Sequence, residues 1–273
     1  MKQFDMTRFG RVLKLDFFEG RKAMMWGALC MLLLYLFFFW FAHNIGFHDS
    51  RFDYEQDPET RMMMRVSAIC EAVGVFSAIA MFIFFLINAS TLYRGEQKKQ
   101  QRIAWLMLPA SNMEKFLSRW IYLLVFSVVG GLLTFFVADL IHMAYLTMTD
   151  YPVQSAADDF FKIFPHTRTF SPLSVTSQYT ALIAIHAFFL LGGVFFKKFH
   201  FIATSAVVVI LFAGVVATVN MLGYRDTPVP LDEVTIQLIF WIIANSGLIA
   251  LFTWLAYWLF CRWQVVTHKF ANV

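Results

Sequence analysis

The chain of 273 residues is 59% hydrophobic and only 15% charged, with a mean hydropathy of +0.63. Because a soluble domain carries about 25% charged residues, this composition excludes an ordinary soluble enzyme. The apolar residues gather in runs of about twenty, long enough for a helix to cross a bilayer, and lack the alternating polarity of barrel strands. The sequence therefore predicts an all-α polytopic membrane protein with a single transmembrane domain over residues 1–273.

The first 22 residues form a basic lead-in that contains six Lys and Arg. Four apolar residues are interleaved with these charges, namely Phe4, Phe9, Leu13 and Phe17. This pattern predicts a helix over about 4–17 that lies in the membrane interface, with a frayed basic tail as the alternative. No small-x-small cleavage site follows the next apolar run, so we expect that run to be a retained first span.

Six apolar runs predict six membrane spans, at about 23–45, 67–92, 119–147, 178–196, 200–222 and 236–261. If the N-terminus is cytoplasmic, the inside segments hold 16 of the 22 Lys and Arg, which leaves six outside. The positive-inside rule then predicts that both termini face the cytoplasm. We expect a multi-pass protein of the cell (inner) membrane. The net charge of +4 follows from this topology and does not indicate a nucleic-acid partner.

The expected outside loops are acidic and rich in turn residues, at 48–65, 149–178 and 223–233. The longest, 149–178, has room for a short surface helix but not for a folded domain.

Motifs for nucleotide or hydrolytic chemistry are missing from the sequence. It contains no GxxxxGK[ST], HExxH, GxSxG or CxxC, so the chain is expected not to be an enzyme or an ATPase by those routes. Cys30, Cys70 and Cys261 lie in or beside apolar runs, which argues against a disulfide framework and against a zinc site of paired cysteines. Any chemistry would come from a partner or from scattered polar residues.

Four of these polar residues form a possible substrate pathway toward the outer ends of the spans: His43, Glu71, Asp139 and His142. Asp139 and His142 are three apart and share a helix face, a spacing that suits a metal or a proton relay. Hydrated residues at span ends are the alternative reading. The possible ligands are few and come from three spans, so we expect no tightly bound transition metal. His186 and Asn245 are expected to form interhelical hydrogen bonds, and the glycines of the spans to allow close packing.

The segment 93–119, which we call the elbow, lies between the second and third spans and carries six basic residues. Residues 97–107 can form an amphipathic helix, and Pro109 should stop it. Ser111 and Glu114 have the spacing of a capping box, which predicts a new helix from about Asn112. The alternative is an ordinary basic loop.

A basic lead-in, six spans and the elbow sequence LMLPASNMEKFLSRW together resemble permease subunits of the type-two ABC exporter class, in particular bacterial forms with an LPAS-x-x-EKF element. The resemblance implies that the elbow docks on a separate ATP-binding subunit, which binds the ATP and Mg, while this chain holds no cofactor. It also implies a connecting helix at about 4–17, a lipid environment and a second permease copy or a paralogue. By position, the docking region would include Glu96, Leu108, Pro109, Ser111, Glu114 and Lys115.

Two other functions remain open from the residues alone. One is an intramembrane metalloenzyme or proton-coupled carrier that uses Glu71, Asp139 and His142. The other is a membrane scaffold or sensor whose elbow binds a partner. An ATPase with Walker motifs encoded beside this chain would favour the exporter, and metal in the purified protein would favour the metalloenzyme.

Overall fold

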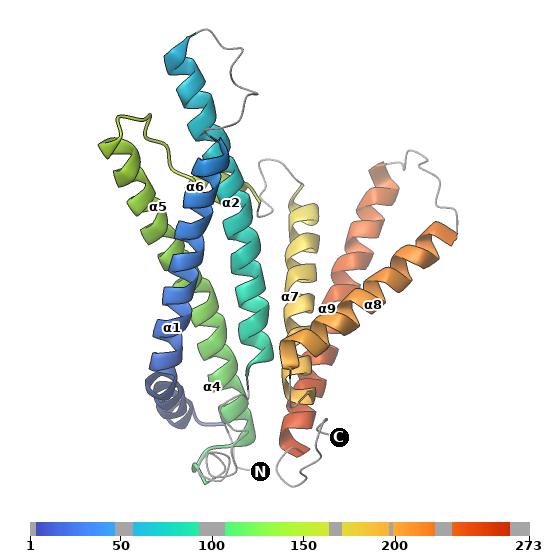
Figure 1. Cartoon of the computed structure of the whole chain (residues 1–273). Helices are drawn as coiled ribbons and strands as arrows, with labels where there is room; N and C mark the ends of the chain where they lie inside the picture. Colours follow the sequence, from blue (N-terminus) through green and yellow to red (C-terminus); the bar gives the residue numbers. More distant parts are fainter. Residues whose placement is uncertain are drawn as a thin grey trace. The chain divides into compact units, whose positions relative to one another are not determined.

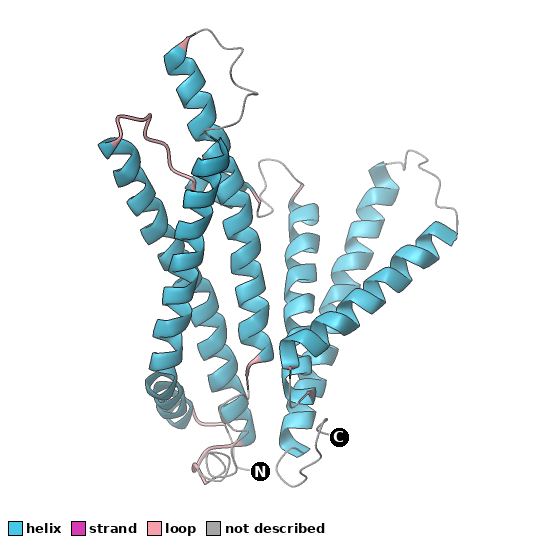
Figure 2. Cartoon of the chain, viewed as in Figure 1, coloured by secondary structure: helices cyan, strands magenta, loops and turns pink. Residues whose placement is uncertain are grey.

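The computed structural model describes residues 4–46, 57–92, 107–163, 171–196, 199–221 and 231–262, with the backbone alone at residues 46, 215–221 and 231–233. Within these ranges the regular elements are helices and no strand occurs (Figure 2). The predicted all-α class is therefore confirmed. The elements are α1 (Met6–Gly46), α2 (Pro58–Ser90), α4 (Asn112–Val125), the π-helix η3 (Phe126–Gly130), α5 (Gly131–Met148), α6 (Ala157–Lys162), α7 (Pro172–Phe195), α8 (His200–Met221) and α9 (Leu231–Arg262).

Several helices begin at a polar residue that caps the first turn. Asp5, Asp57 and Ser171 each accept a hydrogen bond from a backbone N–H two or three residues further on, at 2.8, 3.1 and 3.2 Å respectively. Pro58 and Pro172 occupy the first helical positions of α2 and α7, where the missing N–H costs nothing. These caps satisfy donors that a helix start would otherwise leave unpaired.

Five helices are long and apolar enough to cross a membrane: Met6–Ile45, Pro58–Ser90, Asn112–Met148, Pro172–Phe195 and Val234–Arg262. They cover five of the six predicted spans. The first begins well before residue 23 because the lead-in and the first span form one continuous helix. The remaining predicted span is the fifth, at 200–222. The α8 backbone is helical there over His200–Met221, but its apolar part with described side chains, His200–Gly214, is shorter.

The chain groups into two compact units, and the expectation of one domain stays a prediction. The first unit contains Met1–Asp16, Leu86–Leu123 and Pro165–Val273, and the second contains Phe17–Phe85 and Leu124–Phe164. The divisions fall inside α1, α2 and α4, so each of these helices contributes to both units. We describe each unit by itself.

The core of the second unit is built from α1, α2, α5 and α6 (Figure 1). Aromatic rings form its centre: Tyr35 packs edge-on against Phe135 with ring centroids 5.6 Å apart, and Phe160 stacks on Phe135 at 4.2 Å. Other buried members are Met31, Phe39, Val66, Ile69, Cys70, Val73 and Leu146.

The core of the first unit joins the start of α4 to α7 and α9. Phe116 packs against Tyr257 and Phe260, with ring centroids 5.6 and 5.9 Å away. A Cβ atom at Gly193 would lie 2.5 Å from the carbonyl oxygen of Ser90, so only glycine allows this approach. The packing role predicted for the glycines is therefore confirmed here.

Candidate functional site

The described part of the elbow begins at Met107. Glu96 and most of the predicted helix at 97–107 lie outside the described residues. Leu108, Pro109 and Ala110 are not helical, and the Ala110 N–H donates to the Leu108 carbonyl at 2.8 Å. Because α4 then begins at Asn112, the predicted new helix is confirmed. The helix that Pro109 is predicted to stop lies outside the described residues, so that part stays a prediction.

The start of α4 has the predicted capping box. The Ser111 hydroxyl accepts from the Glu114 backbone N–H at 3.2 Å, and Oε2 of Glu114 accepts from the Ser111 N–H at 2.8 Å. Two donors at the start of the helix are thus satisfied reciprocally. The cap fixes the direction in which α4 leaves the elbow.

The other carboxylate oxygen of Glu114 holds the beginning of α1. Its Oε1 accepts from the Asp5 backbone N–H at 2.8 Å and lies 3.3 Å from the Arg8 guanidinium. The Glu114 side chain is fully buried. Hydrogen bonds from the backbone N–H of Thr7 and of Arg8, with the Arg8 charge, hold the pKa of Asp5 below its usual value. One carboxylate therefore caps α4 and ties α1 to it.

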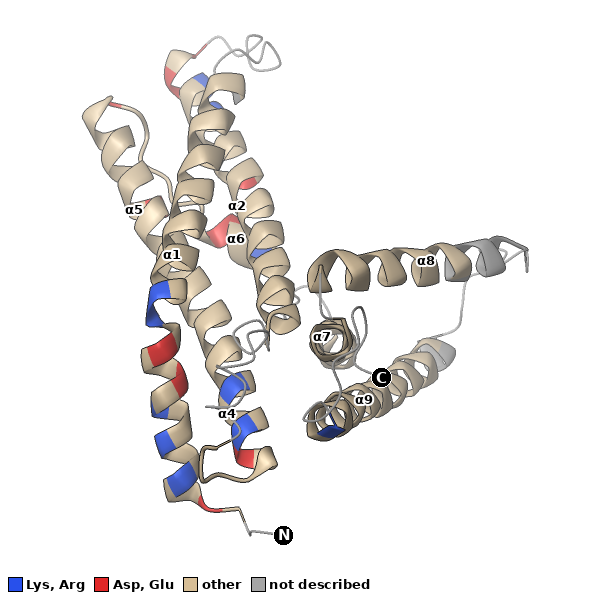
Figure 3. Ribbon diagram, turned by 60° about the horizontal axis from the view of Figure 1, so that its bottom comes forward, with Lys and Arg blue, Asp and Glu red and all other residues tan. Residues whose placement is uncertain are grey.

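A second set of contacts lies one turn further along α4. The buried Asp16 carboxylate accepts a hydrogen bond from the Ser118 hydroxyl, and it lies 3.2 Å from the Arg119 guanidinium. We call the two sets of contacts the junction, which comprises Asp5, Arg8, Asp16, Ser111, Glu114, Ser118 and Arg119. Figure 3 shows charged residues on the first part of α1 and at the start of α4. Charge-assisted hydrogen bonds of this kind are roughly twice as strong as neutral ones.

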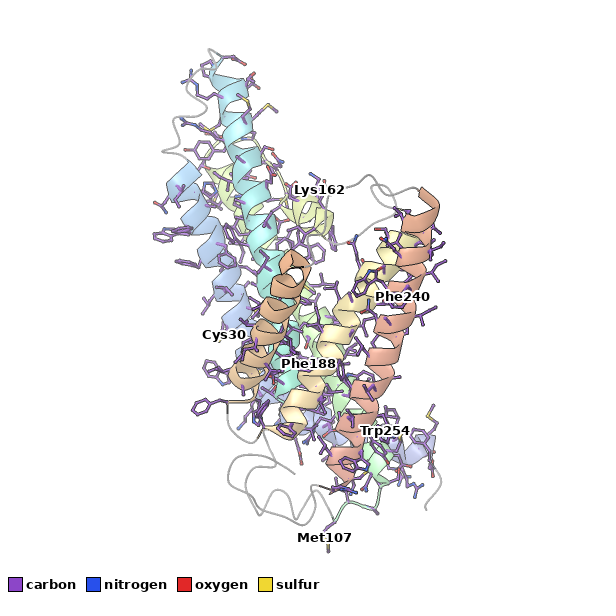
Figure 4. All side chains as sticks on the ribbon, turned by 90° about the vertical axis from the view of Figure 1, so that its right-hand side faces the viewer. Cys30, Met107, Lys162, Phe188, Phe240 and Trp254 are labelled. Atoms are coloured by element: carbon purple, nitrogen blue, oxygen red, sulfur yellow. The ribbon has the colours of Figure 1, made fainter. Side chains whose placement is uncertain are left out.

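The elbow residues that the resemblance selected differ from one another in exposure. Glu114 and Lys115 are buried, and Leu108 packs against the core of the first unit. Met107 is 80% exposed, and Figure 4 labels it at the bottom of the view, in the segment that leads into α4. Pro109 and Met113 are also exposed. Among the described elbow residues these three are exposed, whereas the buried Glu114 holds the starts of α4 and α1 together.

The structure brings together only two of the four polar residues of the predicted pathway. Nε2 of His43 and Nε2 of His142 lie 3.0 Å apart. Asp139 shares a buried face with His142, as predicted, but its carboxylate accepts from the Ser155 hydroxyl at 2.5 Å and the Ala156 N–H at 2.9 Å. Glu71 is exposed. No described contact joins all four residues, so nothing here favours the carrier reading.

The predicted short surface helix in 149–178 is present as α6. One face is exposed, and on the other face Asp159 and Phe160 are buried in the second unit. Asp150 has φ 56° and reverses the chain after α5, as a residue in the left-handed region commonly does at a helix end. Phe160 then reaches back to Phe135, 13 residues before the end of α5, or about 20 Å along its axis. A Cβ at Gly74 would lie 2.7 Å from the Phe160 nitrogen.

Two further expectations concern polar residues in the spans of the first unit. Nε1 of Trp120 donates to Nε2 of His186 at 3.3 Å, which confirms the interhelical hydrogen bond predicted for His186. Asn245 is buried in α9.

Sequence reasoning missed the α1 half of the junction. Asp5, Arg8 and Asp16 looked like ordinary members of a basic lead-in, and no local pattern marks them as partners of α4. Comparison with known proteins identifies no relative: no family model, curated protein or solved structure matches the chain. The function must therefore be argued from the sequence and from the described contacts.

Proposed function

We propose that this chain is the membrane-spanning subunit of an ATP-driven exporter of the type-two ABC class. It would work with a separate ATP-binding subunit and a second permease copy or a paralogue. The resemblance of the elbow sequence supports this proposal, as do the five long apolar helices. With α8 as the fifth span, the chain would cross an inner membrane six times, and the 16-to-6 distribution of basic residues would place both termini in the cytoplasm.

One observation carries the proposal: the Glu114 carboxylate caps the start of α4 and also binds the start of α1. A partner that pushes on the elbow moves the first turn of α4. The hydrogen bond that Glu114 accepts from the Asp5 N–H and its ion pair with Arg8 transmit that movement to α1. An ordinary loop has no need of a fully buried carboxylate with three partners. The junction would thus couple nucleotide-driven closure of the partner to movement of two spans.

The proposed topology can be tested with single cysteines in a background without the three native ones. Met107→Cys and Val153→Cys are suitable because their side chains are 80% and 57% exposed. An impermeant maleimide should label Val153→Cys in intact cells and Met107→Cys only after lysis. Labelling of Met107→Cys in intact cells would contradict the assigned orientation.

The exporter proposal itself is tested with the ATPase encoded nearest to this chain. The two proteins are co-expressed, and co-purification and ATP hydrolysis are measured. The wild-type chain should retain the ATPase and stimulate its turnover. Pro109→Ala should weaken both effects, because the helix break that sets the angle of α4 is removed. Leu211→Ala, on the exposed apolar part of α8, is the control and should preserve them. If the wild-type chain neither binds nor stimulates that ATPase, the proposal fails.

A further inference from the structure

The histidine pair in the second unit has a geometry that its place in a span does not require. His43 lies near the end of α1 and His142 on the buried face of α5, with their Nε2 atoms 3.0 Å apart. Phe39 stacks on the His142 ring with centroids 4.2 Å apart, and Tyr145 meets the His43 ring edge-on at 5.3 Å. Both imidazoles are therefore held in place by aromatic neighbours.

The short separation dictates how protons are distributed. A neutral imidazole carries one N–H and one lone pair, so one Nε2 must donate and the other must accept. Moving the bridging proton to Nδ1 of its own ring would turn both Nε2 lone pairs toward the same point. No proton would leave the pair. Within the described structure, Nδ1 of His142 is buried without a hydrogen-bond partner and can carry such a proton.

The separation of the two Nε2 atoms is close to that of two histidine nitrogens bound to one metal ion. Zinc binds imidazole nitrogen at about 2.0–2.1 Å, so two histidines on a tetrahedral ion have nitrogens about 3.3 Å apart. The observed 3.0 Å needs only a small tilt of one ring to reach this separation. The pair is thus nearly in the arrangement of two zinc ligands before any ion binds.

We infer that His43 and His142 form a reversible binding site for a divalent transition metal of the zinc type, which would bridge α1 and α5. Neutral imidazole is a common ligand for such ions. Water would complete the coordination, because no group of three or more His, Cys, Asp or Glu gathers in the described ranges. Asp139 is engaged by Ser155 and Ala156 and does not supply a third ligand.

The same geometry limits the affinity. Histidine ligands in strong metal sites donate their second N–H to a carboxylate or carbonyl group, which Nδ1 of His142 lacks among the described residues. The ion should therefore exchange readily and be lost on purification. This agrees with the expectation of no tightly bound metal, and it does not depend on the exporter proposal.

The test is a titration of the purified full-length chain with Zn²⁺ against a colorimetric chelator. We expect His43→Gln and His142→Gln each to weaken one class of binding at least about tenfold, on the scale of lost ligand support. His186→Gln is the control, because His186 is buried and paired with Trp120 in the first unit; it should bind as the wild type does. If the wild type binds no Zn²⁺, or if the two pair variants bind it unchanged, the inference is wrong.

A second measurement guards against misfolded variants. In a background without the native cysteines, His43→Cys keeps a zinc ligand at this position. Zn²⁺ should slow its alkylation by a maleimide at least about tenfold, and Mg²⁺ should not. Adding His142→Gln should abolish the slowing. Protection that persists without His142, or that is absent when His142 is present, would overturn the bridge between α1 and α5.

Discussion

The junction and the histidine pair both join α1 to the α4–α5 region, over nearly the same distance in sequence. Asp5 and Glu114 are 109 residues apart, and His43 and His142 are 99 apart. The junction uses carboxylates that accept several hydrogen bonds each. The histidine pair has a single hydrogen bond, between the two Nε2 atoms. A carboxylate with several donors is costly to remove, because each donor loses its partner. We therefore expect the contacts of the junction to hold α1 and α4 together firmly, and the contact between His43 and His142 to rearrange more easily.

Among the changes proposed here, removing the Glu114 side chain should cause the largest loss in unfolding free energy. Glu114→Ala leaves the N–H groups of Asp5 and Ser111 without this acceptor and removes the ion pair with Arg8. Because an unsatisfied buried donor costs about 1–3 kcal/mol, we expect a loss of about 3 kcal/mol in unfolding free energy. The measurement is thermal or denaturant unfolding in detergent. Met113→Ala, at the exposed neighbouring position, is the control; equal losses in the two variants would show that the junction does not stabilise the unit.

Asp139 offers the corresponding change in the second unit. Asp139→Ala removes the acceptor for the Ser155 hydroxyl and the Ala156 N–H, which should release the segment that leads into α6. We expect a local cost of about 2 kcal/mol, or about 30-fold faster amide exchange over 155–162. Asp158→Ala, which changes an exposed residue, should leave exchange there nearly unchanged. Slow exchange in Asp139→Ala would mean that Phe160 packing alone holds α6.

These two regions also show what a sequence can predict. The cap of α4 was predictable because Ser111 and Glu114 are three residues apart, and the rule that relates them is local. The helical class and five spans followed from the length of the apolar runs. Long-range pairing has no such rule, so neither the bond between Glu114 and Asp5 nor the contact of His43 with His142 could be read from the residues.

The sequence also did not predict the burial of two charged residues or the packing of α6. The sequence suggests that Glu114 and Lys115 are surface charges, yet both are buried in the first unit. For Glu114, the burial goes with its contacts to Asp5 and Arg8 at the beginning of α1, which are tertiary contacts. The packing of α6 likewise depends on Gly74 leaving room for the Phe160 backbone.

The cap alone should contribute less than the whole junction. Ser111→Ala removes the acceptor for the Glu114 N–H but leaves the bonds from Glu114 to α1. We expect a loss of about 1 kcal/mol in unfolding free energy. Ser171→Ala removes the equivalent cap of α7 and should cost a similar amount without affecting ATPase stimulation. A loss from Ser111→Ala as large as that from Glu114→Ala would show that the cap, and not the contact with α1, dominates.

Lowering the pH should have the smallest effect, a loss of stability in the first turn of α1. The folded-state pKa of Asp5 is lowered by the backbone N–H of Thr7 and neighbouring groups, so the folded form binds this proton less readily than the unfolded form. The stabilising contribution is present above the unfolded pKa of about 3.9 and is lost as the pH falls further. Amide exchange at Thr7 and Arg8, corrected for intrinsic rates, should therefore increase below about pH 4. In Asp5→Asn this increase should be absent, and its persistence would assign the change to another group.

The central claim is that an ATP-binding subunit docks on the elbow, and site-specific photocrosslinking tests it most directly. A photoreactive residue is placed at Met107 or, as the control, at Met148; these methionines are 80% and 85% exposed and lie before α4 and at the end of α5. With the co-expressed ATPase, the residue at position 107 should give a crosslinked product of the two chains, and the residue at position 148 should give none. No product at 107, or equal products at both positions, would contradict the assignment of this chain as the permease subunit of an ATP-driven exporter.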